Sequence, residues 1–508
     1  MLKISLNKIK KYYGDRLLFE CGSLRIYEGE RIAITGVNGC GKTTLLNILA
    51  GVSPADGGEA VINGSVSYAA QLDEGFAQGA TAGGAFPGLI SAEFNAAEEY
   101  LAHLSGGEKT RYRISAALER ARDILILDEP TSNLDMRAIE ILEEKLKEFR
   151  GTLIIVSHDR TLLQKICGRV IEIENSRIND FDCGYLEYEY QKKLIFERAE
   201  FEYYDYLSEK KRIERAIVDK KQKSWEMRKT PKRMGNSEAR LHTRGINSKK
   251  KKIDGAAQAL KSRLAQLEVK EKPYRPGKVK ISVPEYGRVH ARAVVSCDNL
   301  GKNFGEKIIF EEARFEIPAY AKTALIGPNG CGKTTLIKMI MAAEGNIRVS
   351  AQARVGYFGQ GIETLDYRKS VLENVSESSL HDETTVRTLL AGLLFRRDEV
   401  HKKAESLSGG ERVKTAIAKI LLAGFNFLIL DEPTNYLDAF SLSALEEVLA
   451  DYDGAMLVCS HDRRFVNNVA DRTLIIRDKK IVTYEGSYDE YLNHVMAVKT
   501  GSGSVRLE

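Results

Sequence analysis

Two adjacent carboxylates occur twice in this chain, each time at the end of a run of apolar residues. Asp128 and Glu129 follow one run, and Asp431 and Glu432 follow the other. A carboxylate at the end of such a strand commonly holds Mg²⁺ through water, and a neighbouring carboxylate can polarise an attacking water. The alternative role for Glu129 and Glu432 is to cap the turn that follows. The repeated pairs therefore predict magnesium-assisted hydrolysis at two places.

Each carboxylate pair is preceded by a glycine-rich loop with phosphate-binding spacing. The loops read GVNGCGKTT and GPNGCGKTT. Glycines let backbone N–H groups surround phosphate oxygens, and the following helix adds the positive end of its dipole. We expect the lysines to contact the β- and γ-phosphates and the next threonine to bind Mg²⁺. The predicted ligands are Gly36, Asn38, Gly39, Gly41, Lys42, Thr43 and Thr44, and in the second half Gly327, Asn329, Gly330, Gly332, Lys333, Thr334 and Thr335.

Three further short motifs repeat in the same order in both halves. LSGGE opens a helix, where serine and two glycines form a second anion site. SHD follows an apolar run and suits contact with a γ-phosphate; a lone histidine would more often be structural, but the repetition favours a functional role. A glutamine after a β-like run fits a position that senses Mg²⁺ or water. The residues are Gln71, Ser105, Gly106, Gly107 and His158, and then Gln360, Ser408, Gly409, Gly410 and His461.

The elements that must position these motifs alternate between strands and helices. RIAITG is a β-rich run before the first glycine loop, and TTLLNILAG is a helical run after it. DILILDEP and GTLIIVSHD are almost continuously apolar, as expected for strands buried on both faces. The sequence therefore predicts a tandem duplication of an α/β fold with a largely parallel sheet. Because each half has two phosphate-binding elements, we expect the halves of one monomer to pair head to tail around two ATPs.

Along the chain, each half contains motifs that resemble the Walker A, Q-loop, signature, Walker B, D-loop and His-switch motifs of ATP-binding cassette proteins, in that order. The resemblance implies two cassettes that hydrolyse ATP with Mg²⁺, and catalytic roles for Glu129, Glu432, His158 and His461. The implied Mg²⁺ ligands are Thr43, Gln71, Asp128, Thr334, Gln360 and Asp431. One implied site combines Lys42, Thr43, Gln71, Asp128, Glu129 and His158 with Ser408, Gly409 and Gly410. The other combines Lys333, Thr334, Gln360, Asp431, Glu432 and His461 with Ser105, Gly106 and Gly107.

Two further positions follow from the resemblance. Tyr13 and Phe304 each precede a glycine near the start of a half and match the aromatic that stacks on adenine, although a core aromatic is an open alternative. Ser132 departs from the family pattern, which has asparagine, as the second half does at Asn435. This departure leaves open whether the two sites hydrolyse ATP equally.

A basic segment separates the two halves. Residues 208–252 contain 17 Lys and Arg against 5 Asp and Glu, although the whole chain has a net charge of only +5. Apolar residues at 3,4 spacing over 196–227 and 253–267 predict an antiparallel helical hairpin, with an irregular tip near 228–250 that holds Pro231, Gly235 and Gly245. The alternative to a polyanionic partner is a well-solvated hairpin. The tip residues that could bind RNA phosphates and bases are Trp225, Arg228, Lys229, Lys232, Arg233, Arg240, His242 and Arg244.

Two cassettes joined by a charged helical segment resemble the ABC-F family. The implied organisation is a first cassette over 1–187, a hairpin over 188–285, a second cassette over 286–495 and a tail over 496–508. The family binds the 70S ribosome at the E site in the ATP state, with the linker directed toward P-site tRNA and the peptidyl-transferase centre. The short stretch from Gln71 to Ser105, with FRRDEVHK and LSGGERVK, is most similar to the Vga-type resistance members. These protect ribosomes from lincosamides, pleuromutilins and streptogramin A.

Two rival functions stay open. A general ABC-F translation factor would rescue stalled ribosomes without antibiotic, and a transporter ATPase would serve separate membrane subunits. The chain has no run of ~20 apolar residues, so we expect no membrane-spanning segment. Seven scattered cysteines without a CxxC pair are typical of free thiols in a reducing cytoplasm, which is the expected location.

Overall fold

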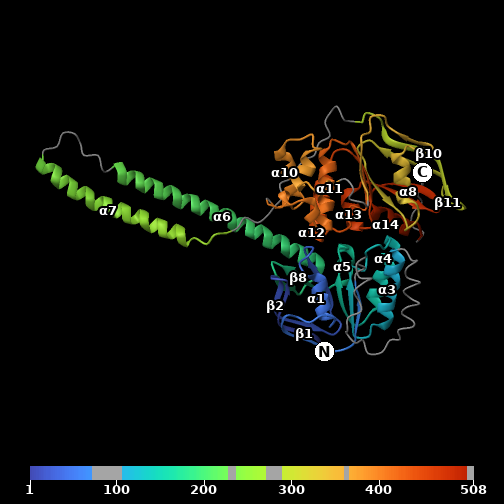
Figure 1. The fold of residues 1–508 in the computed structure, drawn as a ribbon, viewed down its shortest axis with the longest axis horizontal. Coiled ribbons are helices and arrows are strands. Elements are labelled where there is room, and N and C mark those ends of the chain that lie inside the picture. The colour runs from blue at the N-terminus through green and yellow to red at the C-terminus, as the bar shows by residue number, and fades with distance from the viewer. Residues whose placement is uncertain (71–105, 227–235, 271–288, 360–364, 397, 500–508) are drawn as a thin grey trace. The chain divides into compact units, whose positions relative to one another are not determined.

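The computed structural model describes the backbone of residues 1–70, 106–226, 236–270, 289–359, 365–396 and 398–499. The chain divides into two compact units, one made of Met1–Leu186 with Pro276–Glu508 and the other of Glu187–Arg275. The first unit holds both halves of the sequence repeat, and the second holds the segment between them (Figure 1).

The first half is built on a nine-stranded sheet of order β4-β1-β2-β9-β8-β3-β7-β6-β5. Strands β5, β6, β7, β3 and β8 run parallel to one another, whereas β8 pairs with β9 antiparallel. β6 and β7 are buried along their whole length, which explains their continuous apolar sequence. The elements are β1 (Leu2–Tyr13), β2 (Arg16–Tyr27), β3 (Arg31–Gly36), α1 (Lys42–Leu49), β4 (Gly57–Ile62), β5 (Val66–Ala69), α3 (Gly106–Arg120), β6 (Ile124–Asp128), α4 (Met136–Glu148), β7 (Thr152–Val156), α5 (Arg160–Ile166), β8 (Arg169–Glu174) and β9 (Arg177–Phe181).

The second half repeats this arrangement in two sheets, β11-β10-β13 and β14-β15-β16-β12-β17-β18. Its parallel strands follow the same order as those of the first half. The elements are β10 (Ala293–Phe304), β11 (Lys307–Pro318), β12 (Lys322–Ile326), α8 (Lys333–Met341), β13 (Ile347–Val349), β14 (Val355–Phe358), α9 (Val371–Ser376), α10 (Glu383–Gly392), η3 (Glu399–His401), η4 (Ala404–Ser406), α11 (Gly409–Leu422), β15 (Phe427–Asp431), α12 (Ala439–Ala450), β16 (Ala455–Cys459), α13 (Arg463–Val469), β17 (Arg472–Arg477), β18 (Lys480–Glu485) and α14 (Tyr488–Lys499).

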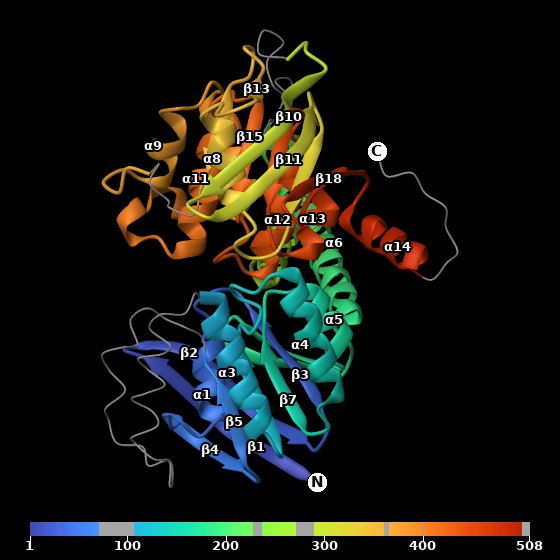
Figure 2. The ribbon, with the colours of Figure 1, turned by 90° about the vertical axis from the view of Figure 1, so that its right-hand side faces the viewer.

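The two halves meet within the first unit. Figure 2 shows α4 and α5 of the first half facing α12 and α13 of the second. Side chains of α5 contact α12, and side chains of α13 contact α4. The predicted α/β fold of two tandem cassettes is confirmed by these sheets, and the pairing of the halves brings their glycine loops toward one cavity.

The second unit is a helical hairpin of α6 (Tyr185–Glu226) and α7 (Asn236–Gln266). Ser224 Oγ donates to Asp254 Oδ1 at 2.7 Å, and Arg263 Nη2 lies 3.0 Å from Glu209 Oε1. These pairs show that the helices run antiparallel. Ile213, Ile217 and Ala257 are buried between them, as the predicted apolar stripe requires.

One expectation for the hairpin is wrong. The sequence predicted an irregular tip over about 228–250, but α7 already begins at Asn236 and continues through Gly245. A glycine inside a helix costs only about 1 kcal/mol. Each residue added to an existing helix contributes a backbone hydrogen bond, so a helix packed farther along can extend through one glycine. Among the described residues, no helix has both the length and the apolar character needed to cross a membrane.

Candidate functional site

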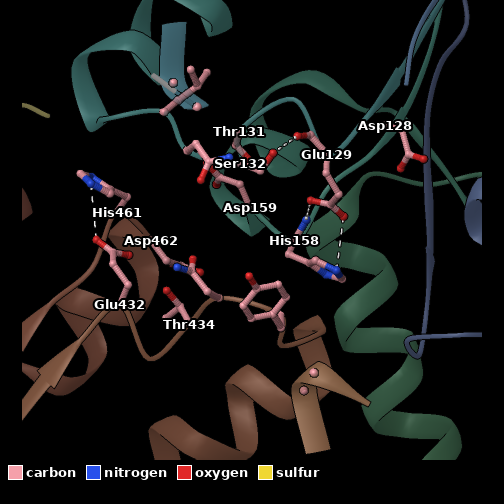
Figure 3. A pocket seen from close by; sticks show the side chains of 18 of the residues that line it. Asp128, Glu129, Thr131, Ser132, His158, Asp159, Glu432, Thr434, His461 and Asp462 are labelled. Atoms are coloured by element: carbon pink, nitrogen blue, oxygen red, sulfur yellow. Dashed lines mark hydrogen bonds and ion pairs between the residues drawn. The ribbon is translucent and has the colours of Figure 1, made fainter. Parts of the chain in front are cut away.

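A cavity of about 1590 Å³ lies where the two halves meet, and residues of both halves line it (Figure 3). Most of the predicted nucleotide-site residues that the structure describes lie on its walls. They are Tyr13, Asn38, Gly39, Gly41, Lys42, Thr43, Thr44, Gly106, Gly107, Asp128, Glu129, His158, Asn329, Gly330, Gly332, Lys333, Thr334, Thr335, Ser408, Gly409, Gly410, Asp431, Glu432 and His461.

The glycine loops connect β3 to α1 and β12 to α8. Gly41 and Gly332 precede the helices with φ of 102° and 107°, a backbone conformation that residues with a Cβ rarely adopt. Lys42 Nζ donates to the carbonyl oxygen of Gly36 at 2.9 Å, and Lys333 Nζ donates to that of Gly327 at 2.8 Å. Both lysines therefore curl over their own loop, in the position from which an ammonium group reaches bound phosphates.

The residues next to the loops suit a magnesium ion. Thr43 Oγ1 donates to Asp128 Oδ2 at 2.8 Å, and Thr334 Oγ1 donates to Asp431 Oδ2 at 3.2 Å. Asp128 Oδ1 is buried and has no hydrogen-bond partner among the described residues. Burial raises the pKa of Asp128 to about 6, which a bound cation would oppose. Hydroxyl and carboxylate oxygens are hard ligands of the kind Mg²⁺ prefers, so this set fits the ion.

The candidate catalytic glutamates have a strained backbone. Glu129 and Glu432 have φ of 49° and 54°, in the left-handed region that non-glycine residues avoid. Such strain gathers at functional sites. Burial raises the pKa of Glu129 to about 7 and that of Glu432 to about 8, which is the range that suits a general base at neutral pH.

Each glutamate faces a histidine of its own half. His158 Nε2 lies 3.3 Å from Glu129 Oε1, and His461 Nε2 lies 3.4 Å from Glu432 Oε1 (Figure 3). Burial lowers the pKa of both histidines to about 4, so both rings are neutral at neutral pH. The helices that follow are capped by the side chains of Asp135 and Asp438. The structure therefore does not support the alternative that the glutamates serve as helix caps.

The signature helices α3 and α11 begin at the cavity. Ser408 caps α11 in a capping box with Glu411. A Cβ on Gly410 would lie 2.6 Å from the carbonyl oxygen of Tyr436, and one on Gly107 would lie 2.6 Å from that of Asn133. Only glycine permits this close approach of the backbone. Three predicted residues, Gln71, Ser105 and Gln360, lie outside the described residues.

The glycine loop of each half is bonded to the opposite half. Asn38 N donates to Asp438 Oδ2 at 3.2 Å, and Asn38 Nδ2 donates to the Tyr436 carbonyl at 2.8 Å. In the second half, Asn329 makes the same bonds to Asp135 at 3.1 Å and to Asn133 at 3.0 Å. The predicted head-to-tail arrangement is thus the one in the structure. We call the site with Lys42 the first composite site and the site with Lys333 the second.

Sequence reasoning missed several residues at these sites. Asn133, Asp135, Tyr436 and Asp438 were not among the predicted ligands, although the repeated LD after each carboxylate motif was a signal for them. Arg111 on α3 also lines the cavity. No repeated sequence motif includes this arginine.

The remaining predicted residues are the two candidate adenine-stacking aromatics and the residues of the hairpin tip. Tyr13 is 80% exposed at the β1–β2 turn and lines the cavity, whereas Phe304 is 57% exposed and lies outside the described lining. Trp225 is 60% exposed near the end of α6. Other tip residues fall outside the described part of the chain: Arg228, Lys229, Lys232 and Arg233 entirely, and Arg240, His242 and Arg244 for their side chains.

The chain is similar in sequence to several known proteins. A family model described as "ABC transporter" matches residues 20–78, 88–132 and 310–435. The chain is 30% identical to the ribosome protection protein VmlR of Bacillus subtilis (strain 168), over 99% of this chain and 91% of that protein. It is 32% identical to the erythromycin resistance ATP-binding protein MsrA of Staphylococcus epidermidis, over 92% of this chain and 96% of that protein.

Two further comparisons bear on function and fold. The chain is 29% identical to the energy-dependent translational throttle protein EttA of Escherichia coli (strain K12), over 92% of this chain and 91% of that protein. Among solved structures, it is similar to a crystal structure of the archaeal ribosome recycling factor aABCE1 with ribosomal stalk protein aP1. The TM-score is 0.59 at 21% identity, over 97% of this chain and 92% of that chain, a likeness that shows the shared fold.

Proposed function

Because this chain belongs to the ABC-F family of ATP-binding cassette proteins, we propose that it binds the 70S ribosome and protects it from antibiotics of the peptidyl-transferase centre. Such antibiotics are lincosamides, pleuromutilins and streptogramin A. In this proposal the protein acts in the cytoplasm as a monomer, and its hairpin extends from the E site toward rRNA and P-site tRNA. The observation that carries the proposal is similarity to a named ribosome protection protein over almost the whole length of both chains.

The chain is an ATP hydrolase, as its two ABC domains indicate, and domains of this class bind ATP, generally with Mg²⁺. We assign the catalytic work to the residues that face the cavity. Lys42 and Lys333 bind phosphate oxygens, while Thr43, Asp128, Thr334 and Asp431 hold Mg²⁺, which neutralises phosphate charge. Glu129 and Glu432 orient the attacking water, and the neutral His158 and His461 keep each glutamate in place.

The hairpin supplies the second support for a ribosomal target. Its two helices bury Ile213, Ile217 and Ala257 against one another, so the pair forms a stiff arm. At about 1.5 Å per residue, the 42 residues of α6 span about 63 Å. Lys249, Lys251 and Lys252 are exposed on α7. A stiff arm with exposed cations suits phosphate-rich RNA better than it suits a membrane subunit.

The first test is growth of an antibiotic-sensitive bacterium with and without the expressed protein. Lincomycin, tiamulin, virginiamycin M and erythromycin should be compared, with the Glu129→Gln/Glu432→Gln variant as the inactive control. Protection against the first three that is lost in the control supports the proposal. Erythromycin is included because the chain is similar to an erythromycin resistance protein. Protection against erythromycin alone would contradict the predicted drug classes.

A second candidate function rests on the similarity to a translational throttle protein. In that case the chain would be a general translation factor that acts on stalled ribosomes without antibiotic. No protection against any of the four drugs, together with ribosome binding that depends on ATP, would favour this function. Failure to bind ribosomes in the presence of ATP would contradict both candidates.

A further inference from the structure

The two composite sites share their backbone contacts but differ in one side chain. Tyr436 and Asn133 occupy equivalent positions of the repeat, and the carbonyl of each accepts a hydrogen bond from the asparagine of the opposite glycine loop. Both residues line the cavity. The first composite site therefore contains an aromatic ring where the second contains a short amide.

The backbone at Tyr436 does not explain the choice of an aromatic residue. Tyr436 has a φ of 67° and Asn133 a φ of 62°, both in the left-handed region. Asparagine is among the residues that tolerate this conformation best, whereas a bulky side chain is a rare choice there. A strained position that carries an unfavourable residue points to a role for the side chain itself.

The surroundings of Tyr436 place its ring beside the anion-binding end of α11. A Cβ added to Gly409 would lie 3.4 Å from Tyr436 Cγ, so the side chain packs along the start of the signature helix. Tyr436 is nevertheless 68% exposed. A nucleotide that bridges Lys42 and Gly410 would occupy the space that this exposed ring borders.

We propose that the Tyr436 ring covers the ATP bound at the first composite site, so that ATP leaves this site more slowly than it leaves the second. Covering the ring removes apolar surface from water only when the nucleotide is present, which stabilises the bound state. Asn133 offers little apolar surface at the second site. We expect the difference in release rate to be about tenfold.

The test uses the full-length protein without ribosomes, in which Glu129→Gln and Glu432→Gln prevent turnover. The protein is loaded with radiolabelled ATP and Mg²⁺, unlabelled ATP is added in excess, and retained label is followed. We expect two phases of release. Adding Lys42→Ala should remove the slow phase, and adding Lys333→Ala should remove the fast phase. The opposite assignment of the phases would overturn the proposal.

Exchange of the two residues tests the ring directly. Tyr436→Asn should accelerate the slow phase about tenfold, and Asn133→Tyr should slow the fast phase. Tyr436→Phe keeps the ring and should keep the slow phase. The matched control is Tyr27→Asn, which removes an exposed tyrosine from β2 outside the cavity lining and should change neither phase.

Two results would overturn the proposal. One is a slow phase that survives in Tyr436→Asn, and the other is a Tyr436→Phe variant that releases ATP as fast as Tyr436→Asn. Thermal melting of each variant shows whether it is folded. Because Tyr436 and Asn133 are exposed, we expect their replacement to leave the protein folded. Because no ribosome takes part, the result does not depend on whether the protein protects ribosomes.

Discussion

Arg160 of α5 in the first half and Glu446 of α12 in the second form a buried ion pair. Arg160 is 1% exposed and Glu446 is 8% exposed, and Arg160 also donates to Ser443 Oγ at 3.0 Å. The repeat supplies the reciprocal contact. Arg463 of α13 donates to the Met136 carbonyl at 2.9 Å and lies 3.2 Å from Glu140 Oε1. These bonds join the halves beside the histidines of the ATP sites.

Breaking the pair at one end should destabilise the protein. Glu446→Ala leaves a buried guanidinium without its carboxylate, and loss of one partner of a buried ion pair costs about 3–5 kcal/mol. The measurement is the free energy of unfolding from urea denaturation. The control is Lys145→Ala, because Lys145 and Glu148 form an exposed pair that should contribute less than about 1 kcal/mol. Equal effects of the two variants would contradict the importance of the buried pair.

The close approach at Gly410 predicts a loss of hydrolysis without a loss of fold. In Gly410→Ala the new Cβ meets the Tyr436 carbonyl at 2.6 Å, so the start of α11 and the loop at Tyr436 in the same half must separate. A shift of about 1 Å in catalytic geometry can slow a reaction about 100-fold. ATPase rate and circular dichroism measure the two effects. Gly301→Ala is the control, since nothing lies within 4 Å of its added Cβ; a similar loss there would refute the steric explanation.

Replacing both candidate catalytic glutamates should separate binding from hydrolysis. Glutamine keeps the shape of Glu129 and Glu432 but cannot accept a proton, and general-base catalysis contributes typically 10²–10⁴-fold. The double variant should therefore hydrolyse ATP at least about 100-fold more slowly while still retaining ATP. In the proposed mechanism it also accumulates on ribosomes, which sedimentation measures. An ATPase rate near that of the wild type would show that another group activates the water.

Much of the site was predictable because its chemistry repeats in the sequence. The glycine loops, the carboxylate pairs and the SHD motif occur in the same order twice, and each pattern has a local physical meaning. The pairing of Asn38 with Asp438 was harder to predict. It joins residues from opposite halves, and nothing in the local sequence around Asn38 indicates which carboxylate its N–H will meet.

The buried contacts between the halves were also hard to predict, because local sequence does not indicate which residues of the opposite half will cover a side chain. Arg160 and Arg463 each follow the SHD motif and look like surface cations in the sequence, yet both are buried by the opposite half. The hairpin shows the converse case. Its apolar stripe correctly indicated two packed helices, but the glycine signal near residue 245 was outweighed by helix propagation, so the second helix begins earlier than its pattern suggested.

That outcome at Gly245 leads to a prediction for the other glycine of α7. Gly255 lies on an exposed part of the helix, and nothing lies within 4 Å of a Cβ built there. Gly255→Ala should stabilise the helix by about 0.5–1 kcal/mol, because alanine loses less backbone freedom on folding and clashes with no neighbour. Hydrogen exchange of the hairpin amides measures the effect locally. Slower exchange confined to α6 and α7 is expected.

The control for this change is Ala257→Gly in the same helix. Ala257 is buried against α6, so its replacement removes both packing and helix propensity and should speed exchange in both helices. ATP hydrolysis should be unchanged in Gly255→Ala, because the cavity residues belong to the other unit. Faster exchange in Gly255→Ala would mean that α7 needs the freedom of glycine at this position, and the helix would then be strained where the structure shows open space.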